Sequence, residues 1–292
     1  MARDRYRGGR VNRVRRVLLL LAAALLLNGC SPADTLNLLA WRHGIEITRS
    51  VAYGEAPRQT LDVYRPAASA KSPVIVFFYG GSWQTGDKET YLFVATALAQ
   101  RGYVVVVPDY RVYPQVRYPA FLEDGARAVR WAKDNAARLG GDPGRLFVMG
   151  HSAGAYIAAM LVLDSRWLQG VGLTPNRDVA GLIGISGPYD FLPLHDGVLA
   201  TIFGGANVPD TQPISHVAPG APPALLVTGQ RDNIVEPSNT TRLAAKLAAN
   251  GDKAVVKTYP WVGHLTIVGS FALPLRFLSP VLNDVDRFVA AQ

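Results

Sequence analysis

The 292-residue sequence holds a single cysteine, Cys30, and no apolar run long enough to span a bilayer. One thiol excludes a disulfide framework and any paired Cys-x-x-Cys metal site. The chain also lacks the zinc motif HExxH and the phosphate-binding loop GxxxxGK(S/T). We therefore expect no cofactor and no metal, and the chemistry has to come from side chains of the protein itself.

Most of the excess positive charge lies at the N-terminus, so the rest of the chain is nearly neutral. The formal net charge is +8, but residues 1–29 hold seven arginines and only one acid, Asp4. The rest of the chain carries 23 basic and 21 acidic residues, a balance of +2. So small an excess does not indicate a nucleic-acid partner.

The N-terminus has the pattern of an export signal. The arginine-rich start precedes an uncharged run at residues 17–27, which is too short to span a membrane and fits a signal-peptide core. Cys30 follows directly, and the sequence around it resembles the lipobox of bacterial lipoproteins. We expect a signal peptide at 1–29, a lipid on Cys30, a tether at 30–46 and an exported, membrane-anchored catalytic domain at 47–292. The alternative is a cleaved secretory peptide with an incidental cysteine.

Apolar runs alternate with helical segments along the rest of the chain, which predicts one α/β domain with a mostly parallel sheet and helices on both faces. The first strand is expected to pair antiparallel at the sheet edge. Predicted strands are residues 60–64, 74–79, 103–107, 146–149, 179–185, 224–228 and 254–259. Predicted helices are residues 89–101, 121–139, 153–163, 238–250 and 280–290.

Residues 187–223 interrupt this rhythm with many prolines and glycines. The stretch is longer than an ordinary connection between elements, yet short for a full cap domain. We interpret it as a short insertion over the active-site end of the sheet.

A serine lies at a predicted strand–turn–helix junction. The apolar run at 146–149 leads into Gly150-His151-Ser152-Ala153-Gly154, and an alanine-rich helix follows. Such a turn strains the backbone so that the hydroxyl is exposed, and its small neighbours let strand and helix approach closely. The helix N-terminus places the amide of Ala153 beside a developing oxyanion. Ser152 is the predicted nucleophile.

A neutral serine needs a base and an acid that orients the base. With this kind of turn, the order along the chain is serine, acid, histidine. Asp232 and His264 each follow one of the last two predicted strands. Because carboxyl ends of parallel strands meet at one edge of the sheet, we expect Ser152, Asp232 and His264 to form a triad.

The other candidate acids and histidines have simpler interpretations. Asp109 is expected to pair with Arg111 and hold a loop. His151 adjoins the nucleophile, but its side chain points away from the hydroxyl, which favours a structural or pocket-wall role. Ordinary loop or capping roles are expected for His43, His195, His216, Asp190 and Asp196, unless the insertion folds across the pocket.

A glycine-rich turn follows the predicted strand at 74–79, in the sequence Tyr79-Gly80-Gly81-Ser82-Trp83. Glycine allows backbone N–H groups to approach a substrate carbonyl closely. We assign the amides of Gly81 and Ser82, with that of Ala153, to an oxyanion hole, and expect Trp83 to brace the loop or line the acyl side.

Taken together, these segments resemble the esterase and lipase branch of the α/β-hydrolases. Within it they are similar to acetylesterase-like, feruloyl-esterase-like and kynurenine-formamidase-like proteins. YGGSWQTGDK stands for the HGGxW loop of those proteins and PDYRVYP for PDYRLAP, while GHSAG, ISGPYD, residues 229–235 and the late Gly-His occur in family order over residues 58–292. Tyr79 replaces the usual histidine, which normally stabilises the loop.

The resemblance implies ester hydrolysis through an acyl-enzyme intermediate, with a small-molecule ester as substrate. An amidase with the same triad is the alternative enzyme, and a ligand-binding surface lipoprotein without catalysis is the alternative of another class. Acyl specificity and oligomeric state stay open. Side chains expected to line an apolar pocket are Tyr79, Trp83, Tyr113, His151, Tyr156, Phe191 and Trp261.

Overall fold

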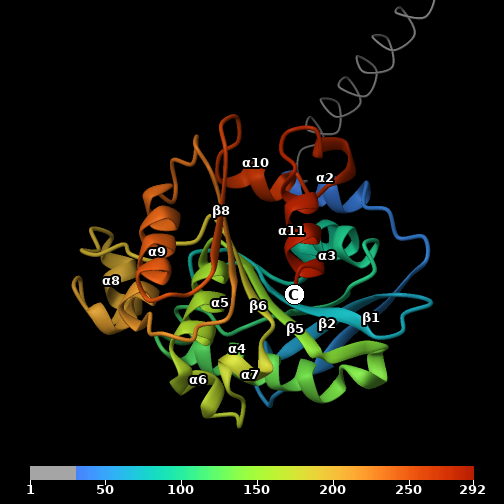
Figure 1. Cartoon of the computed structure of the whole chain (residues 1–292), viewed down its shortest axis with the longest axis horizontal. Helices are drawn as coiled ribbons and strands as arrows, with labels where there is room; N and C mark the ends of the chain where they lie inside the picture. Colours follow the sequence, from blue (N-terminus) through green and yellow to red (C-terminus); the bar gives the residue numbers. More distant parts are fainter. Residues whose placement is uncertain (1–30) are drawn as a thin grey trace, which may run out of the picture.

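The computed structural model describes residues 31–292, which fold around one eight-stranded sheet (Figure 1). Its strands in spatial order are β1 (Ile45–Ala52), β2 (Thr60–Pro66), β4 (Val104–Pro108), β3 (Ser72–Phe78), β5 (Gly141–His151), β6 (Gly181–Ile185), β7 (Ala224–Gly229) and β8 (Ala254–Tyr259). β2 pairs antiparallel with both β1 and β4, and every other pairing is parallel. The predicted fold class is confirmed.

Helices cover both faces of the sheet (Figure 1). α3 and α11 lie on one face, and α4, α5 and α9 lie on the other. The helices are α2 (Pro32–Leu38), α3 (Leu92–Ala99), α4 (Ala120–Asn135), α5 (Ala153–Leu163), α6 (Ser165–Gln169), α7 (Pro175–Asp178), α8 (Gly197–Phe203), α9 (Ser238–Ala249), α10 (His264–Gly269) and α11 (Val281–Ala290). Short 3-10 turns are η1 (Glu89–Tyr91), η2 (Ala137–Leu139), η3 (Pro209–Thr211), η4 (Pro213–His216) and η5 (Leu273–Leu275).

The central strands are buried on both faces, which explains their unbroken apolar sequence. Every residue of β4, β6 and β7 is buried, and so is every residue of α5, the helix that leaves the nucleophile turn. A helix without a polar face has to lie inside the domain. This rigid centre carries the turn between β5 and α5.

Two N-terminal expectations are corrected. The first predicted strand, now β2, is antiparallel but is not the edge, because β1 covers it. The expected tether at 30–46 is in part packed structure: the side chain of Asn37 in α2 donates to the backbone oxygen of Glu89 at 2.8 Å and accepts from the amide of Phe93 at 3.0 Å. α2 is thus fastened to the start of α3.

Residues 187–223 lie as predicted, beside the carboxyl ends of the parallel strands. The segment contains α8, η3 and η4, and part of it lines the same cleft as Ser152. Tyr156 of α5 holds the segment in place, because its hydroxyl donates to the backbone oxygen of Thr211 at 2.7 Å.

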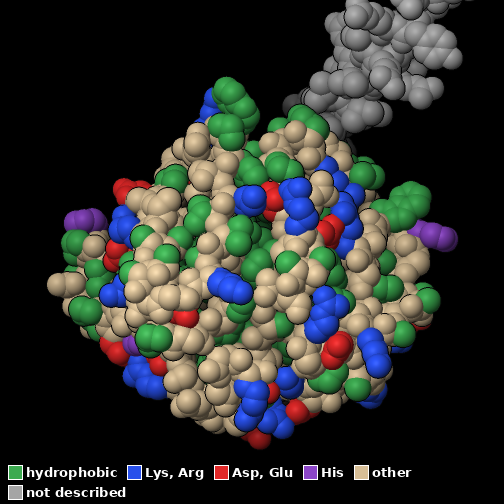
Figure 2. Space-filling view, in the orientation of Figure 1, with side chains coloured by type: hydrophobic (Ala, Val, Ile, Leu, Met, Phe, Trp, Pro, Cys, Tyr) green, Lys and Arg blue, Asp and Glu red, His purple; other side chains and the backbone are tan. Residues whose placement is uncertain are grey.

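The predicted signal peptide and Cys30 lie outside the described residues. Within residues 31–292, no helix is both long and apolar enough to span a bilayer. Basic and acidic side chains are interspersed on the face seen in Figure 2.

Candidate active site

Ser152 occupies a strained turn between β5 and α5. Its backbone has φ 56° and ψ −126°, outside the region that side chains favour. Its amide donates to the backbone oxygen of Ile185 at 3.0 Å, which ties the turn to β6. A Cβ on Gly154 would lie 2.1 Å from the backbone oxygen of Phe78, so no larger residue fits where α5 passes β3. The turn predicted from GHSAG is present.

Asp232 and His264 come together as predicted. Nδ1 of His264 lies 2.8 Å from Oδ2 of Asp232, and both side chains are buried. Oδ1 of Asp232 accepts the amides of Ile234 at 3.0 Å and Val235 at 2.9 Å. Burial acts to raise the pKa of Asp232, but the bonds from His264 and the two amides outweigh it and lower that pKa. The carboxylate is therefore ionised and aimed at the imidazole.

His264 lies next to the nucleophile turn. Its ring centroid is 4.8 Å from that of His151, the residue that precedes Ser152. Within residues 31–292, Ser152 Oγ forms no hydrogen bond to a protein group. Such bonds are often long before a substrate arrives and tighten in the reacting complex.

The glycine turn after β3 packs against the nucleophile. A Cβ on Gly80 would lie 2.9 Å from that of Ser152. Gly81, at φ 145°, turns its carbonyl away to accept the amides of Gln84 and Thr85 at 3.0 Å each. In the part of the chain that the structure describes, the amides of Gly81, Ser82 and Ala153 donate to no protein acceptor. They remain available for an oxyanion.

Tyr79 braces this turn and does not line the pocket, which corrects the prediction. Its ring is fully buried and stacks on Tyr110 with ring centroids 4.8 Å apart. Its hydroxyl donates to Asp109 at 2.8 Å and accepts from Arg58 at 2.8 Å, while Arg58 also holds the backbone oxygen of Gly86 at 2.7 Å. The loop therefore has a brace of its own in place of the missing histidine.

The expected pairing of Asp109 with Arg111 is wrong. Asp109 instead accepts from the ammonium of Lys88 at 3.1 Å and from its amide at 2.8 Å. Arg111 pairs with the buried Asp124 at 2.7 Å. Both ion pairs hold loops, but the one at Asp109 serves the glycine turn.

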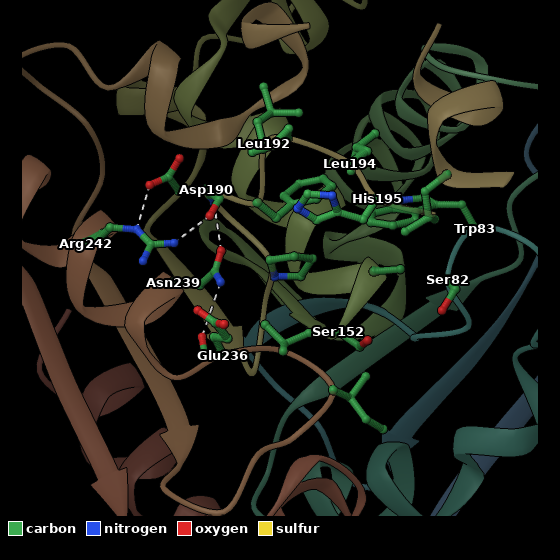
Figure 3. Close-up of a pocket in the computed structure, with 17 residues that line it drawn as sticks. Ser82, Trp83, Ser152, Asp190, Leu192, Leu194, His195, Glu236, Asn239 and Arg242 are labelled. Carbon is green, nitrogen blue, oxygen red and sulfur yellow. Dashed lines mark hydrogen bonds and ion pairs between the residues drawn. The ribbon is translucent and has the colours of Figure 1, made fainter. Parts of the chain in front are cut away.

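A cleft of about 750 Å³ opens above Ser152 (Figure 3). One wall is mainly apolar and contains Trp83 and the Phe191, Leu192 and Leu194 side chains of the insertion. The other contains polar side chains, namely Glu236 before α9 and Asn239 and Arg242 in its first turns. The lining residues are Ser82, Trp83, Ser152, Ala153, Pro188, Asp190, Phe191, Leu192, Pro193, Leu194, His195, Leu199, Ile234, Val235, Glu236, Asn239 and Arg242.

Two of the predicted aromatic residues line this cleft, namely Trp83 and Phe191, whose rings stack 6.0 Å apart. The others do not. Tyr156 lies behind Trp83 in an edge-on contact at 5.1 Å, and Tyr113 is not among the lining residues. Trp261 is 71% exposed to solvent. The guanidinium of Arg231 lies over one face of its ring, 4.9 Å from the ring centroid.

His151 and His195 differ from expectation in opposite ways. His151 is buried behind the turn and does not line this cleft, so of its two predicted roles only the structural one is left. His195, expected to be an ordinary loop residue, lines the cleft because the insertion folds across it.

The polar wall was missed. Asn239 accepts the amides of Tyr189 at 2.9 Å and Asp190 at 2.8 Å, and Arg242 donates to the Asp190 carboxylate at 2.6 Å. These contacts, drawn in part in Figure 3, fix the insertion to α9. A polar residue at a core-facing position of a helix is the only sequence signal that could have indicated Asn239.

Nothing in this arrangement provides a metal centre. Across residues 31–292, no three His, Cys, Asp or Glu side chains are grouped so as to hold a metal ion. What the site offers is a serine, an aspartate–histidine pair and free amides, which together suit acyl transfer.

The geometry agrees with comparisons to known proteins. The chain is 32% identical over 242 residues to a probable isoprenylcysteine alpha-carbonyl methylesterase from Oryza sativa subsp. japonica, covering 75% of this chain and 57% of that protein. Esterase LipC from Mycobacterium tuberculosis is 32% identical, with coverage of 76% and 58%. The chain thus spans a little over half the length of these curated relatives.

Solved structures share the fold. Inhibited esterase B from Lactobacillus rhamnosis matches with a TM-score of 0.75 and 21% identity over 97% of each chain. A hyperthermophilic esterase from Pyrobaculum calidifontis matches with a TM-score of 0.72 and 22% identity over 89% of this chain and 90% of that one. The BD-FAE family model matches residues 61–247, more than half of the sequence. The chain therefore belongs to the BD-FAE family, and its fold is that of the α/β-hydrolases.

Proposed function

We propose that this protein is a serine hydrolase that cleaves carboxylic esters. The observation that carries the proposal is the strained Ser152 at the end of β5, with the buried Asp232–His264 pair, bonded at 2.8 Å, next to it. The relatives named as esterases support the same reaction class.

In the first half-reaction, Ser152 Oγ attacks the ester carbonyl while Nε2 of His264 takes its proton. Asp232 holds Nδ1 of the same ring and stabilises the imidazolium that forms. The amides of Gly81, Ser82 and Ala153 donate hydrogen bonds to the oxyanion. His264 then protonates the alkoxide as the C–O bond breaks, which leaves an acyl-serine.

The second half-reaction repeats these roles with water. His264 removes a proton from water, the resulting hydroxide attacks the acyl-serine, and the same amides hold the second oxyanion. The proton returns to Ser152 Oγ as the carboxylic acid leaves.

Replacing Ser152 with Ala tests the proposal. We expect Ser152→Ala to lose all measurable ester turnover and all labelling by a fluorophosphonate probe, with its melting temperature retained. Ser215→Ala, an exposed serine in η4, is the matched control and should behave as the wild type. Turnover retained in Ser152→Ala would contradict the assignment, and a folded wild type that the probe does not label would indicate a non-catalytic binding protein.

An amidase with the same triad is the second candidate. It is favoured by the similarity to kynurenine formamidase from Danio rerio, 35% identical over 166 residues, which cover 54% of each chain. Esters have the better leaving group, so we expect a matched aryl acetate to be hydrolysed much faster than the corresponding anilide. The reverse order would identify an amidase.

The cleft indicates the kind of ester. Trp83, Phe191 and Leu192 make one wall apolar, and a volume of about 750 Å³ suits a small ester with an apolar or aromatic group. Turnover of aryl esters of increasing acyl length would map this wall. Rates that do not depend on acyl length would place the apolar group on the alcohol side.

We also propose that the protein is exported and anchored through a lipid on Cys30. Exposed apolar side chains near the first described residues support this: Leu38 is 81% exposed and Phe277 80%. Trp41 and Leu273 share one small surface cleft, and Figure 2 shows hydrophobic side chains on the surface around α2 and α10. Metabolic labelling with an alkyne fatty acid should mark the wild type but not Cys30→Ser. Equal labelling would contradict the lipid site.

A further inference from the structure

Behind the nucleophile, the buried His151 contacts two other parts of the site. Its Nε2 lies 3.1 Å from the backbone oxygen of His264, and its Nδ1 lies 3.3 Å from the hydroxyl of Tyr91. That hydroxyl also accepts the amide N–H of Gly80 at 3.3 Å. One chain of hydrogen bonds therefore joins the glycine turn to the start of α10, and the triad does not use it.

Each bond of this chain has only one possible direction. A carbonyl oxygen can only accept, so Nε2 of His151 carries a proton. In a neutral imidazole Nδ1 is then an acceptor, so the Tyr91 hydroxyl donates to it. The lone pairs of the Tyr91 oxygen accept the Gly80 amide. The order is Gly80 N–H to Tyr91, Tyr91 O–H to His151, and His151 N–H to the His264 carbonyl.

The neutral state of His151 fits the charge that the reaction creates. Burial, followed by the neighbouring His264, lowers the pKa of His151 to about 3. Burial also raises the pKa of Tyr91 to about 12. Both groups are thus uncharged near neutral pH. The His264 ring, 4.8 Å away, therefore gains its positive charge without a cation beside it.

We propose that Tyr91 and His151 are positioning residues, which hold the oxyanion turn and the general base at a fixed spacing across Ser152. This inference rests on the proposed hydrolase function. Asp232 orients the imidazole of His264, whereas His151 fixes the main chain of the same residue. Tyr91 engages the amide of Gly80, which leaves the next two amides for the substrate. The chain thus couples the two halves of the site.

Three variants test this. His151→Phe removes both ring nitrogens, His151→Gln restores an N–H donor near the Nε2 position, and Tyr91→Phe removes only the hydroxyl. Tyr103→Phe is the matched control, because its hydroxyl donates to Asp286 of α11 at 2.9 Å and takes no part in the chain of hydrogen bonds at His151. The readouts are kcat and KM on an aryl ester, the rate constant for fluorophosphonate labelling of Ser152, and the melting temperature.

We expect His151→Phe to lower kcat and the labelling rate roughly 10- to 100-fold, with KM within about twofold. His151→Gln should recover most of the loss, Tyr91→Phe should lose a few-fold, and Tyr103→Phe should match the wild type. Combining Tyr91→Phe with His151→Phe should add little further loss, because both interrupt one chain.

Additive losses, or a Gln variant as slow as the Phe variant, would overturn the inference, since either result indicates mere packing. If His151→Phe does not fold, Tyr91→Phe against Tyr103→Phe decides: equal labelling rates contradict the chain. A wild type that the probe does not label contradicts the proposed hydrolase instead. A labelled wild type with unslowed variants contradicts only the positioning role.

Discussion

The nucleophile turn and the insertion at 187–223 face each other across the cleft, but they are held in different ways. The turn is fixed by backbone against backbone, as the 2.1 Å approach of a Cβ on Gly154 to Phe78 shows. The insertion is held by side chains, with Phe203 edge-on to Trp83 at 4.8 Å. The side-chain packing of the insertion can therefore change one residue at a time, whereas the nucleophile turn has no room for an added methyl group at Gly154. We infer that the turn sets the chemistry and the insertion sets which ester fits.

The largest effect should come from one methyl group placed in the turn. Gly154→Ala puts a Cβ against backbone of β3, which cannot move without disturbing the sheet. We expect a loss of more than about 4 kcal/mol in the free energy of unfolding, and no activity. Gly197→Ala, at the start of α8 in the insertion, is the control, because its Cβ meets nothing within 4 Å. Denaturant titrations that give similar stabilities for both would remove the contrast.

The next effect concerns the anchor of the insertion. Phe203 is buried against Trp83, Tyr156 and Phe191. Truncation by Phe203→Ala leaves a cavity and should lower the free energy of unfolding by roughly 3 to 4 kcal/mol. Because the triad lies outside the insertion, we expect KM to rise more than kcat falls. Steady-state kinetics on the folded fraction check this, and a fall in kcat alone would mean that the insertion positions the reacting groups.

A smaller effect, the pH dependence of the free energy of unfolding, distinguishes the nucleophile turn from the insertion. Unfolded His151 binds a proton below pH about 6.5, but its pKa in the fold is about 3 because of burial. Folding must expel that proton between these values, so stability falls as pH drops through this window, by about 2 kcal/mol at pH 5. The pKa of Asp232 is lower in the fold than in the unfolded chain, so its carboxylate stabilises the fold at pH values above the unfolded pKa. That stabilisation is lost only as the pH falls through the lowered pKa of the folded state.

Urea unfolding at pH 7 and pH 5 measures this effect. His151→Gln should lose much less stability between the two pH values than the wild type does. His195→Gln, in the insertion, should keep the wild-type dependence, because its side chain is exposed. The same pH dependence in all three proteins would show that the proton is bound elsewhere.

The smallest effect is at the junction of the insertion with α9. Arg242 holds both the carboxylate and the backbone oxygen of Asp190, at 2.6 Å each, but its side chain is 41% exposed. Solvent screens such a pair, so Arg242→Gln should raise KM only about threefold and leave kcat unchanged. Arg130→Gln breaks the exposed pair with Asp134 on α4 and should change neither. A changed kcat in Arg242→Gln would show that Arg242 takes part in the reaction itself.

The same contrast explains what the sequence could predict. Ser152 and Asp232 follow the buried carboxyl ends of β5 and β7, and His264 follows the edge strand β8, so strand order brought them to one edge without knowledge of side-chain packing. The residues that line the cleft could not be predicted from strand order in this way. Trp261 lies shortly before His264 in the sequence but outside the cleft, because the loop before α10 turns its ring to solvent.

Elements without a continuous apolar pattern were harder to predict. β1 mixes polar and apolar residues and is mostly exposed, so it was not predicted as a strand, and the expected tether at 30–46 overlaps only its start. Its place is set by pairing with β2, a contact between segments that no local pattern reports. Asn239 and Arg242 were missed for a similar reason, because their partners are backbone atoms and a carboxylate about fifty residues away.

The backbone of Ser152 has a consequence for selection. At φ 56° and ψ −126° only glycine is free of strain, so a Ser152→Gly substitution relieves it while removing the hydroxyl that the proposed reaction uses. Variants chosen for heat resistance alone would drift towards an inactive protein at this position. For the proposed hydrolase, selection for turnover opposes that drift, so libraries of this protein are best screened for activity before stability.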